Sequence, residues 1–414
     1  MVPKGWELSS IGKISDVSSG GTPSRNNEAY WNGNIPWVTT AEVQFKIIED
    51  TVEKITEEGL ANSSAKLFPA GTILMAMYGQ GKTRGQVAKL GIDASTNQAC
   101  AAIVLHTGYE VDFYYQFLIS QYENIREMAN SGGQQNLSGG IVKSIPVPVP
   151  PLTEQKKIAK ILSTWDNAIS VTEKLLTNSQ QQKKALMQQL LTGKKRLLDE
   201  RGVRFSGEWE YTIFGNLGDT YTGLTGKTKE DFGAGKPYIP YINIFKNSRI
   251  DIQNLEYVQV NDDERQSVVK YGDIFFTTSS ETPEEVGMSS VLLEEVSEVF
   301  LNSFCFGFRL NNFETLIPKY ARYLFRSEHV RRQISTLGQG ATRYNLSKRQ
   351  LIKLELKLPC VEEQQKIAAV LSAADAEIST LEKKLACLRD EKKALMQQLL
   401  TGKRRVKVDE AVAE

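Results

Sequence analysis

The stretch KKALMQQLLTGKKR at residues 183–196 returns as KKALMQQLLTGKRR at residues 392–405. Over residues 154–196 and 363–405 the two copies match at 26 of 43 positions without a gap. Shorter echoes extend the repeat, because Asn136-Leu-Ser matches Asn345-Leu-Ser and Trp6-Glu matches Trp209-Glu. Self-similarity at a fixed distance is the sequence signature of a repeated architecture. We therefore predict two halves, each a globular region followed by one long helix.

Both repeated segments carry apolar residues at alternating spacings of three and four, interrupted at matching positions by Lys183 and Lys392. This period predicts α-helices with a narrow apolar seam, the pattern of a coiled coil. Pro150-Pro151 ends the preceding segment, and Gly193 is suited to end the first helix. We expect the helices to pair, although two separate amphipathic helices, each packed on its own domain, also fit the pattern. The predicted seam residues are Ile158, Leu162, Trp165, Ile169, Leu176, Leu186, Leu190, Ile367, Leu371, Ile378, Leu381, Leu385, Leu388, Leu395 and Leu399.

The globular regions hold short β-rich runs between loops rich in glycine, serine and threonine, with a few helical stretches such as residues 111–128. These patterns predict α/β (α+β) domains with mainly β cores. The expected organisation is a first domain at 1–150, a central helix at 151–196, a second domain at 197–358, a distal helix at 359–405 and a tail at 406–414.

Composition excludes several classes of protein. Four widely spaced cysteines without a C-x-x-C pair suit a reducing cytoplasm and argue against a zinc module, and two histidines leave little for a His-ligated metal or a histidine base. No apolar run reaches signal-peptide or membrane-span length, so we expect a cytoplasmic protein. The net charge is only +1, so any nucleic-acid surface must be a local patch.

Residues 76–83, AMYGQGKT, have the letters of a phosphate-binding loop. Such a loop needs a strand before it and a helix after it, so that N–H groups and the helix dipole converge on phosphates. Residues 84–91 contain two glycines and lead into another β-like segment, and the matching strand of the second half is followed by nothing that resembles Gly-Lys-Thr. We therefore predict a polar hairpin-type loop and no nucleotide site.

The two halves have diverged unequally, because the helices are nearly identical while the globular regions match only at scattered positions. The simplest physical account is that the helices contact the same partner twice and the domains contact different targets. Recombination that keeps duplicated helices alike would leave the same pattern.

These features resemble the specificity subunit of type I restriction–modification enzymes, over essentially the whole chain. The resemblance rests on the paired halves, the opening LTEQKKIA at 152–159, the two closing KKALMQQLLTGK motifs and Asn97-Gln-Ala-Cys100 in the first domain. The second domain departs from the last motif with Asn302-Ser-Phe-Cys305. A pseudo-twofold repeat matched to the dyad of a duplex would make the two helices run antiparallel.

The resemblance implies a non-catalytic subunit in which each domain recognises one half of a split double-stranded DNA site and the helices set the spacing. It also implies two methyltransferase subunits on the helices, and restriction endonuclease/translocase subunits that complete the complex. S-adenosylmethionine, ATP and Mg are expected on those partners and not on this chain. The competing hypotheses are a single-chain DNA methyltransferase or nuclease, for which we find no Asn-Pro-Pro-Tyr motif or cofactor loop, and a coiled-coil scaffold, which does not explain two large domains.

Candidate DNA-binding residues are polar side chains in glycine-flanked loops, because Lys and Arg suit phosphates or guanine edges, Gln suits adenine and glycine lets the backbone approach closely. Ordinary loop chemistry is the alternative for each of them. The basic clusters at 194–196 and 403–405 fit either solvated helix ends or contacts with phosphates or with a partner. The candidates are Thr22, Ser24, Arg25, Thr39, Thr40, Tyr78, Gln80, Lys82, Thr83, Arg84, Gln134 and Gln135 in the first domain, and Thr225, Lys227, Lys229, Asn243, Lys246, Thr278, Ser279, Ser280, Thr342, Arg343 and Tyr344 in the second.

Overall fold

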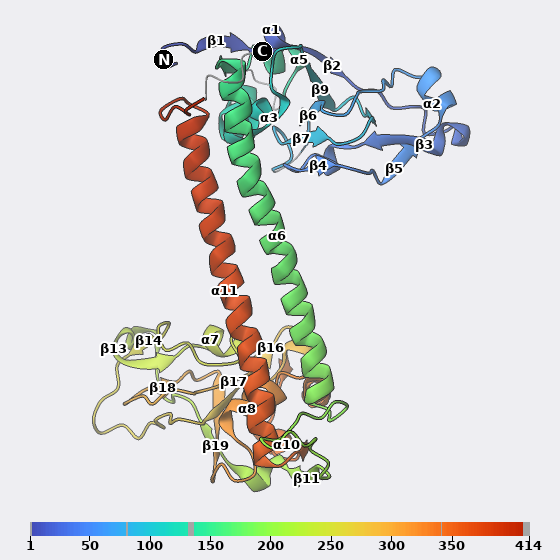
Figure 1. Cartoon of the computed structure of the whole chain (residues 1–414). Coiled ribbons are helices and arrows are strands. Elements are labelled where there is room, and N and C mark those ends of the chain that lie inside the picture. Colours follow the sequence, from blue (N-terminus) through green and yellow to red (C-terminus); the bar gives the residue numbers. More distant parts are fainter. Residues whose placement is uncertain (1, 80–81, 131–135, 341, 409–414) are drawn as a thin grey trace. The chain divides into compact units, whose positions relative to one another are not determined.

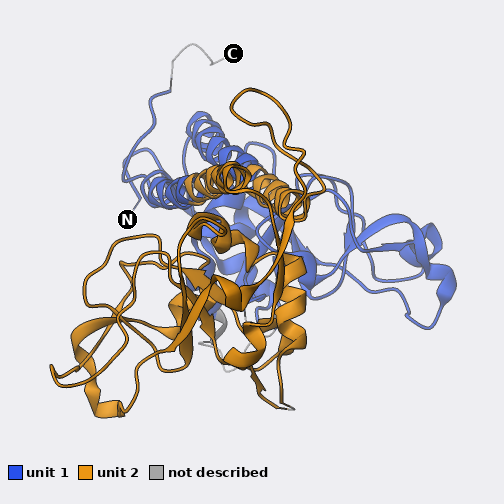
Figure 2. Cartoon of the chain, turned by 90° about the horizontal axis from the view of Figure 1, so that it is seen from below, with its two compact units in different colours: residues 1–173, 383–414 blue, residues 174–382 orange. Residues whose placement is uncertain are grey.

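The computed structural model describes residues 2–79, 82–130, 136–340 and 342–408 (Figure 1). The chain forms two compact units, which Figure 2 shows in different colours. Unit 1 contains residues 1–173 and 383–414, and unit 2 contains residues 174–382. Each long helix is thus divided between the units. The sequence instead predicts each long helix as one undivided segment. Each unit is described by itself below.

Unit 1 is built around a five-stranded sheet of order β2-β9-β6-β7-β4 and a three-stranded sheet of order β5-β3-β8. A two-stranded ribbon, β1-β10, joins the start of the domain to its end. The strands are β1 (Glu7–Ser10), β2 (Ser15–Ser19), β3 (Trp31–Val38), β4 (Ile47–Ile48), β5 (Glu53–Ile55), β6 (Ile73–Ala76), β7 (Val87–Leu90), β8 (Ser95–Thr96), β9 (Cys100–Leu105) and β10 (Pro146–Val149). The helices of the domain are α1 (Ile11–Ile14), α2 (Glu57–Ala61), α3 (Val111–Ser120), α4 (Tyr122–Asn130) and α5 (Gly139–Ser144).

Unit 2 repeats this plan. Its main sheet has the order β12-β19-β15-β17, its smaller sheet the order β14-β13-β18, and its ribbon is β11-β21, with an added pair β16-β20. The strands are β11 (Glu210–Ile213), β12 (Gly218–Thr222), β13 (Phe232–Ile239), β14 (Glu256–Val258), β15 (Ile274–Thr277), β16 (Ser279–Ser280), β17 (Ser289–Val291), β18 (Phe300–Leu301), β19 (Cys305–Leu310), β20 (Tyr344–Asn345) and β21 (Glu355–Leu358). The helices are α7 (Tyr241–Lys246), α8 (Pro318–Leu324), α9 (Glu328–Thr336) and α10 (Lys348–Leu351).

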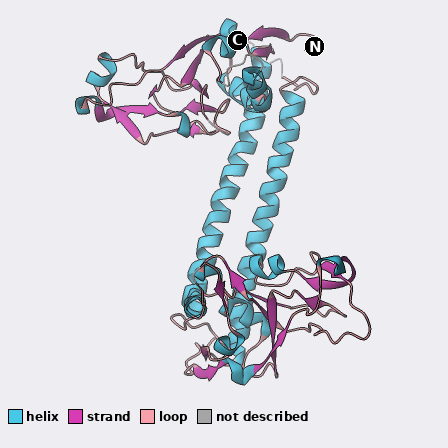
Figure 3. Ribbon diagram, turned by 180° about the vertical axis from the view of Figure 1, so that it is seen from behind, coloured by secondary structure: helices cyan, strands magenta, loops and turns pink. Residues whose placement is uncertain are grey.

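The central strand of each main sheet is buried on both faces, because all four residues of β6 and of β15 are inaccessible. One face packs against helices, including Phe113 of α3 in unit 1 and Tyr320 of α8 in unit 2. The other face packs against loops and short strands, which cover Leu74 and Phe275. Figure 3 shows the strands and helices of each unit, and the predicted α/β class with mainly β cores is confirmed.

The two predicted long helices are α6 (Leu152–Leu190) and α11 (Val361–Leu399). Each ends three residues before a glycine in the left-handed region, where φ is 71° at Gly193 and 69° at Gly402. Glycine has no Cβ and adopts this conformation without strain, so it redirects the chain after the last turn. The helices therefore end earlier than the repeated sequence does, and the basic clusters lie outside them.

Within unit 1, the first part of α6 runs antiparallel to the last part of α11. Asp166 contacts Lys392, with 2.5 Å between carboxylate and ammonium, and farther along α6 Glu173 contacts Arg389, which comes earlier in α11, at 2.7 Å. Within unit 2, Lys183 pairs with Asp375 at 2.5 Å, and Ser179 donates to Glu377 at 3.1 Å.

Every predicted seam residue is buried or half-buried. At the helix ends the seam joins a domain core: Ile158 and Leu399 lie in one core cluster of unit 1, and Leu190 and Ile367 lie in one of unit 2. The two lysines that interrupt the seam are the partners of Asp375 and Asp166. A charged pair in an apolar seam favours one register over others, because a shifted register would leave both charges unpaired.

A buried glutamate at the start of each long helix forms what we call the Glu–Arg–Trp cluster. In unit 2, Glu363 accepts from Arg196 Nε at 2.6 Å, from Arg196 Nη2 at 2.7 Å and from Trp209 Nε1 at 3.3 Å. In unit 1, Glu154 pairs with the guanidinium of Arg405, with Nε at 2.8 Å, and Trp6 Nε1 lies at 3.4 Å.

Each cluster ties the end of one long helix to the start of the other within a single unit. The last arginine of each basic cluster, Arg196 or Arg405, is therefore the partner in an internal ion pair. This role is not among those predicted for the basic clusters from the sequence. No helix within the described ranges is long and apolar enough to cross a membrane.

Candidate nucleic-acid interface

Among residues 77–83, the described ones (77–79, 82 and 83) lie in the connection between two antiparallel strands. Strand β6 precedes them as expected, but the chain then turns into β7, which pairs antiparallel with β6. Ala76 closes the hairpin, because its N–H donates to Gln86 O and its O accepts from Gly85 N–H, both at 2.9 Å. The next element that the structure describes is the strand β7, so the described part of this segment offers no helix N-terminus to hold a phosphate. The predicted hairpin-type loop is confirmed, and Gln80 within it lies outside the described residues.

Three segments of unit 1 meet where β6 ends and β9 begins. The N–H of Met77 donates to Ala99 O at 2.8 Å, and the N–H of Leu137 donates to Met77 O at 3.0 Å. Asn97 shapes the middle segment, because its side-chain oxygen accepts from the N–H of Ala99 at 3.1 Å. The β6–β7 loop, the turn before β9 and the Asn-Leu-Ser segment are thus neighbours.

Unit 2 brings the same three segments together. The N–H of Thr278 donates to Phe304 O at 3.0 Å, and the N–H of Leu346 donates to Thr278 O at 2.8 Å. Asn302 makes the same turn as its counterpart, because its side-chain oxygen accepts from Phe304 N–H at 2.8 Å. The Asn-x-x-Cys motif thus has one structural role in both domains, although its middle residues differ.

The candidate interface of unit 2 has two further parts. Strand β16 pairs with β20, which places Ser280 opposite Tyr344. The hydroxyl of Tyr241, at the start of α7, donates to Ser279 O at 2.9 Å. Phe304 projects beside these segments with 64% of its surface exposed. Sequence reasoning missed Phe304, although aligning the two Asn-x-x-Cys motifs would have pointed to it.

The remaining predicted residues differ in accessibility. Gln134 and Gln135, like Gln80, lie outside the described residues. The exposed ones are Ser24, Arg25, Tyr78, Lys82, Thr225, Lys229, Lys246, Thr342 and Arg343. Those half-buried are Thr22, Thr39, Thr40, Thr83, Arg84, Lys227, Thr278, Ser279 and Tyr344, and those buried are Asn243 and Ser280.

Several predicted side chains already have internal partners. Asn243 is 3% exposed and donates to Asp251 O at 2.8 Å and to Asn254 O at 3.0 Å, so it shapes the turn after α7. Arg25 forms a bidentate pair with Glu53 and lies 3.8 Å from the ring centre of Trp31. The Glu53 hydrogen bond raises the pKa of Arg25, so this guanidinium stays charged.

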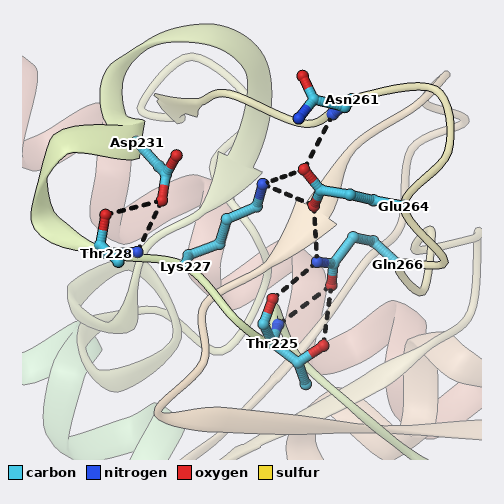
Figure 4. Close-up of polar contacts among 7 residues, drawn as sticks. All are labelled: Thr225, Lys227, Thr228, Asp231, Asn261, Glu264 and Gln266. Carbon is cyan, nitrogen blue, oxygen red and sulfur yellow. Dashed lines mark hydrogen bonds and ion pairs between the residues drawn. The ribbon is translucent and has the colours of Figure 1, made fainter.

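Lys227 is also engaged, as Figure 4 shows. Its ammonium lies 2.6 Å from Glu264, which also accepts from Asn261 N–H at 3.1 Å and from the Gln266 amide. These donors lower the pKa of Glu264 to about 2, Lys227 first among them. Gln266 in turn accepts from the N–H of Thr225 at 3.1 Å, so the cluster ties the loop after β12 to the segment after β14. Exposed Lys229, on the same loop, remains available for a ligand.

Comparison with known proteins identifies the architecture. Residues 3–178 and 207–388 match the family described as "Type I restriction modification DNA specificity domain", once for each half. The chain belongs to this family. The resemblance predicted from the repeat is thereby confirmed.

Relatives of this specificity family include the MjaVIII specificity subunit of Methanocaldococcus jannaschii, which is 25% identical over 98% of this chain and 94% of its own length. The MjaIX specificity subunit of the same organism is 32% identical, over 42% of this chain and 40% of its own length. Among solved structures, the S subunit of a type I restriction-modification system from M. genitalium has the same fold, with a TM-score of 0.59 and 16% identity over 96% of each chain.

Specificity chains of this family are the non-catalytic subunits of type I restriction-modification complexes, and they provide DNA sequence recognition. In unit 1 the β6–β7 loop, the turn before β9 and the Asn-Leu-Ser segment form a surface that we call the three-segment frame, and the matching segments form it in unit 2. This frame is therefore the candidate DNA interface of each unit. Within the part of the chain that the structure describes, no group of three or more His, Cys, Asp and Glu residues could hold a metal ion.

Proposed function

We propose that the chain recognises a split, asymmetric DNA site, with one half-site for each domain. The observation that supports this most strongly is that the same three-segment frame presents different side chains in the two units. Unit 1 offers Tyr78 and Lys82 on its β6–β7 loop, while unit 2 offers Ser279 at the matching place and Phe304 where unit 1 has Ala99. Bases are distinguished by the donors, acceptors and apolar groups that reach their edges, so different side chains select different sequences.

The test is a domain exchange in the full-length chain, assembled with its methyltransferase partner. Residues 1–150 are replaced by the first domain of another family member, and methylated positions are mapped before and after the exchange. We expect one half-site to change and the other to stay. If both half-sites change, independent recognition is refuted.

The helices carry a second part of the proposal, which is that each repeated motif binds one methyltransferase subunit. The support comes from exposed positions that are identical in both copies, since packing does not explain identity at the surface. Lys184 and Gln189 of α6 are exposed, as are their counterparts Lys393 and Gln398 of α11. S-adenosylmethionine would then be held by these partners, and ATP with Mg by restriction endonuclease/translocase subunits that join them in the cytoplasm.

Charge reversal at one copy of the motif tests this docking. Lys184→Glu and Lys393→Glu should each remove one methyltransferase subunit, so that particle mass falls from a complex with two such subunits to one with a single subunit. Lys160→Glu is the matched control, because Lys160 is exposed on α6 but its counterpart is Ala369. Unchanged mass in both variants would exclude this surface.

A further inference from the structure

The β15–β17 connection of unit 2, residues 278–288, lies against an arginine of α9. Arg331 Nη1 donates to Gly287 O at 2.6 Å, and Nη2 donates to Glu284 O at 2.8 Å and to Val286 O at 2.6 Å. The planar guanidinium thus binds three main-chain carbonyls of one loop. Lysine cannot reproduce this arrangement, because its single nitrogen lacks the two-pronged geometry.

Arg331 is half-buried, and the partners that the described residues provide for its guanidinium are these three carbonyls. Burial lowers its pKa to about 10. Burying a guanidinium without an anion costs free energy unless its donors are satisfied. A residue with only a packing role could be apolar at lower cost, so the arginine is suited to hold this backbone in one conformation.

The loop held by Arg331 belongs to the candidate interface. It follows Ser279 and Ser280, which pair with β20, and it ends at Gly287, where φ is 62°. A Cβ at Gly287 would lie 2.5 Å from the side chain of Leu346, so the chain approaches the Asn-Leu-Ser segment closely. The position of the loop therefore depends on contacts at its end, where Arg331 binds.

A neighbouring arginine fixes the other side of the interface. Arg326 donates through Nε to Ser289 O at 2.7 Å, and through Nη2 to Ile244 O at 2.7 Å and Asn247 O at 2.9 Å. The carbonyls at the end of α7 lack partners within the helix, so the guanidinium caps them. Helix α7, which carries exposed Lys246, is thus held to the same α8–α9 frame.

Unit 1 retains an arginine at the matching place. Arg126 of α4 aligns with Arg331 of α9, because each arginine follows a β-branched apolar residue in the helix. A Cβ added to Gly85 would lie 3.1 Å from Cγ of Arg126. Gly85 ends the β6–β7 loop with φ of 83°, as Gly287 ends the loop of unit 2. Tyr122 extends this support, because its hydroxyl donates to Lys82 O and accepts from Arg126 at 3.3 Å.

We propose that Arg331 is a positioning residue for DNA recognition by unit 2, because it fixes the conformation of the β15–β17 loop without contacting bases. This inference rests on the proposal that each domain recognises its own half-site. Unit 1 has an arginine, Arg126, at the matching place although the loop sequences of the two domains have drifted apart, which is expected if the frame is shared and the bases recognised are not.

The experiment uses the full chain in complex with its methyltransferase subunits. The target and the half-site of each unit are first assigned by methylation mapping and by the domain exchange above. Arg331→Met and Arg331→Lys are then compared on three duplexes: the intact target, one with the half-site of unit 2 scrambled, and one with the other half-site scrambled. Arg332→Met is the matched control, because Arg332 is the next residue of α9 but is exposed and forms its ion pair with Glu328 on the same helix, at 2.7 Å.

We expect both Arg331 variants to lose about tenfold or more of their discrimination at the half-site of unit 2, the order of one lost base contact. Discrimination at the other half-site and the behaviour of Arg332→Met should stay within about twofold of the wild type. Hydrogen exchange at residues 284–289 should rise in the same variants. If Arg331→Met does not fold, Arg331→Lys alone decides.

Two results would overturn the inference: wild-type discrimination in a folded Arg331 variant, or equal loss at both half-sites, which indicates a general charge effect. Failure of the domain exchange would instead refute the proposed function, and the two failures are distinguishable because the exchange leaves Arg331 intact.

Discussion

Replacing Arg196 by methionine should destabilise unit 2. Glu363 has a fully buried side chain, and Arg196, 20% exposed, is its charged partner. Removing one member of a buried ion pair costs about 3–5 kcal/mol, because the other charge stays buried without compensation. Water reaches part of Arg196, so we expect the lower end, about 3 kcal/mol. For a unit of this size that corresponds to a fall in Tm of roughly 6–12 °C.

The measurement is scanning calorimetry of the full chain, with tryptophan fluorescence to follow Trp209, whose indole N–H contacts Glu363. Arg201→Met is the matched control, because Arg201 is 86% exposed beside the same helix end and should change stability by less than about 0.5 kcal/mol. The twin variant Arg405→Met should cost only about 1–2 kcal/mol, because Arg405 is 41% exposed and solvent screens its pair with Glu154.

A double variant separates charge from packing. Arg196→Met with Glu363→Met removes both charges, and apolar replacement of a whole buried pair is often neutral. We expect it to recover more than half of the lost Tm. The reasoning fails if the Tm of Arg196→Met lies within about 2 °C of the wild-type Tm. Such a small shift would mean that the substitution costs less than about 1 kcal/mol.

Three further predictions concern DNA. Lys229→Met should weaken DNA binding and lower the slope of log K against log salt concentration by about one. Lys227→Met should leave that slope unchanged, because Lys227 is the partner of Glu264. Equal slopes in the two variants would contradict the distinction between a free and an internally paired lysine. Lys82→Ala combined with Arg84→Ala should weaken binding by about 2–3 kcal/mol and flatten the salt dependence, and unchanged affinity across a salt series would leave this loop without a role. Inserting one heptad after both Leu176 and Leu385 should keep the seam in register, add about 10 Å of helix and widen the unread gap by two to four base pairs; a folded variant that keeps its original gap would show that the helices do not set the spacing.

The repeat, the helices and the β cores could be predicted because their signals are local. Identity between two segments, a period of three and four, and short β-rich runs need no knowledge of distant contacts. The polar partners could not be predicted in the same way. Lys183 interrupts the seam in sequence, and only the folded unit shows that Asp375 is its partner. Arg196 looked like a solvated helix end because Glu363 is far along the chain.

The sequence indicated which loops carry polar side chains, but not which of those side chains are free to bind a ligand. Tyr78 and Lys82 are exposed on the predicted loop, whereas Asn243 and Lys227 use their polar atoms inside the protein. The reason is chemical: asparagine and lysine in a glycine-rich loop are equally suited to close turns and to contact nucleic acid. Residue type alone does not separate the two roles, since only the fold shows which donors are already used.

Comparison of the two units distinguishes residues that maintain the fold from those that we propose select a sequence. The Glu–Arg–Trp clusters are present in both units with the same residue types, as are the seam lysines with their aspartates. The turn made by Asn97 and Asn302 is also the same, yet the residue two positions after the asparagine is an exposed Phe304 in one unit and a half-buried Ala99 in the other. Because the main chain of these positions makes the contacts that close the frame while their side chains do not, substitutions there should change the exposed chemistry at little cost to folding. If each domain recognises its own half-site, as proposed, such a chain can acquire a new half-site by substitution in one set of loops while the other half-site and the proposed partner surfaces of the helices stay as they were.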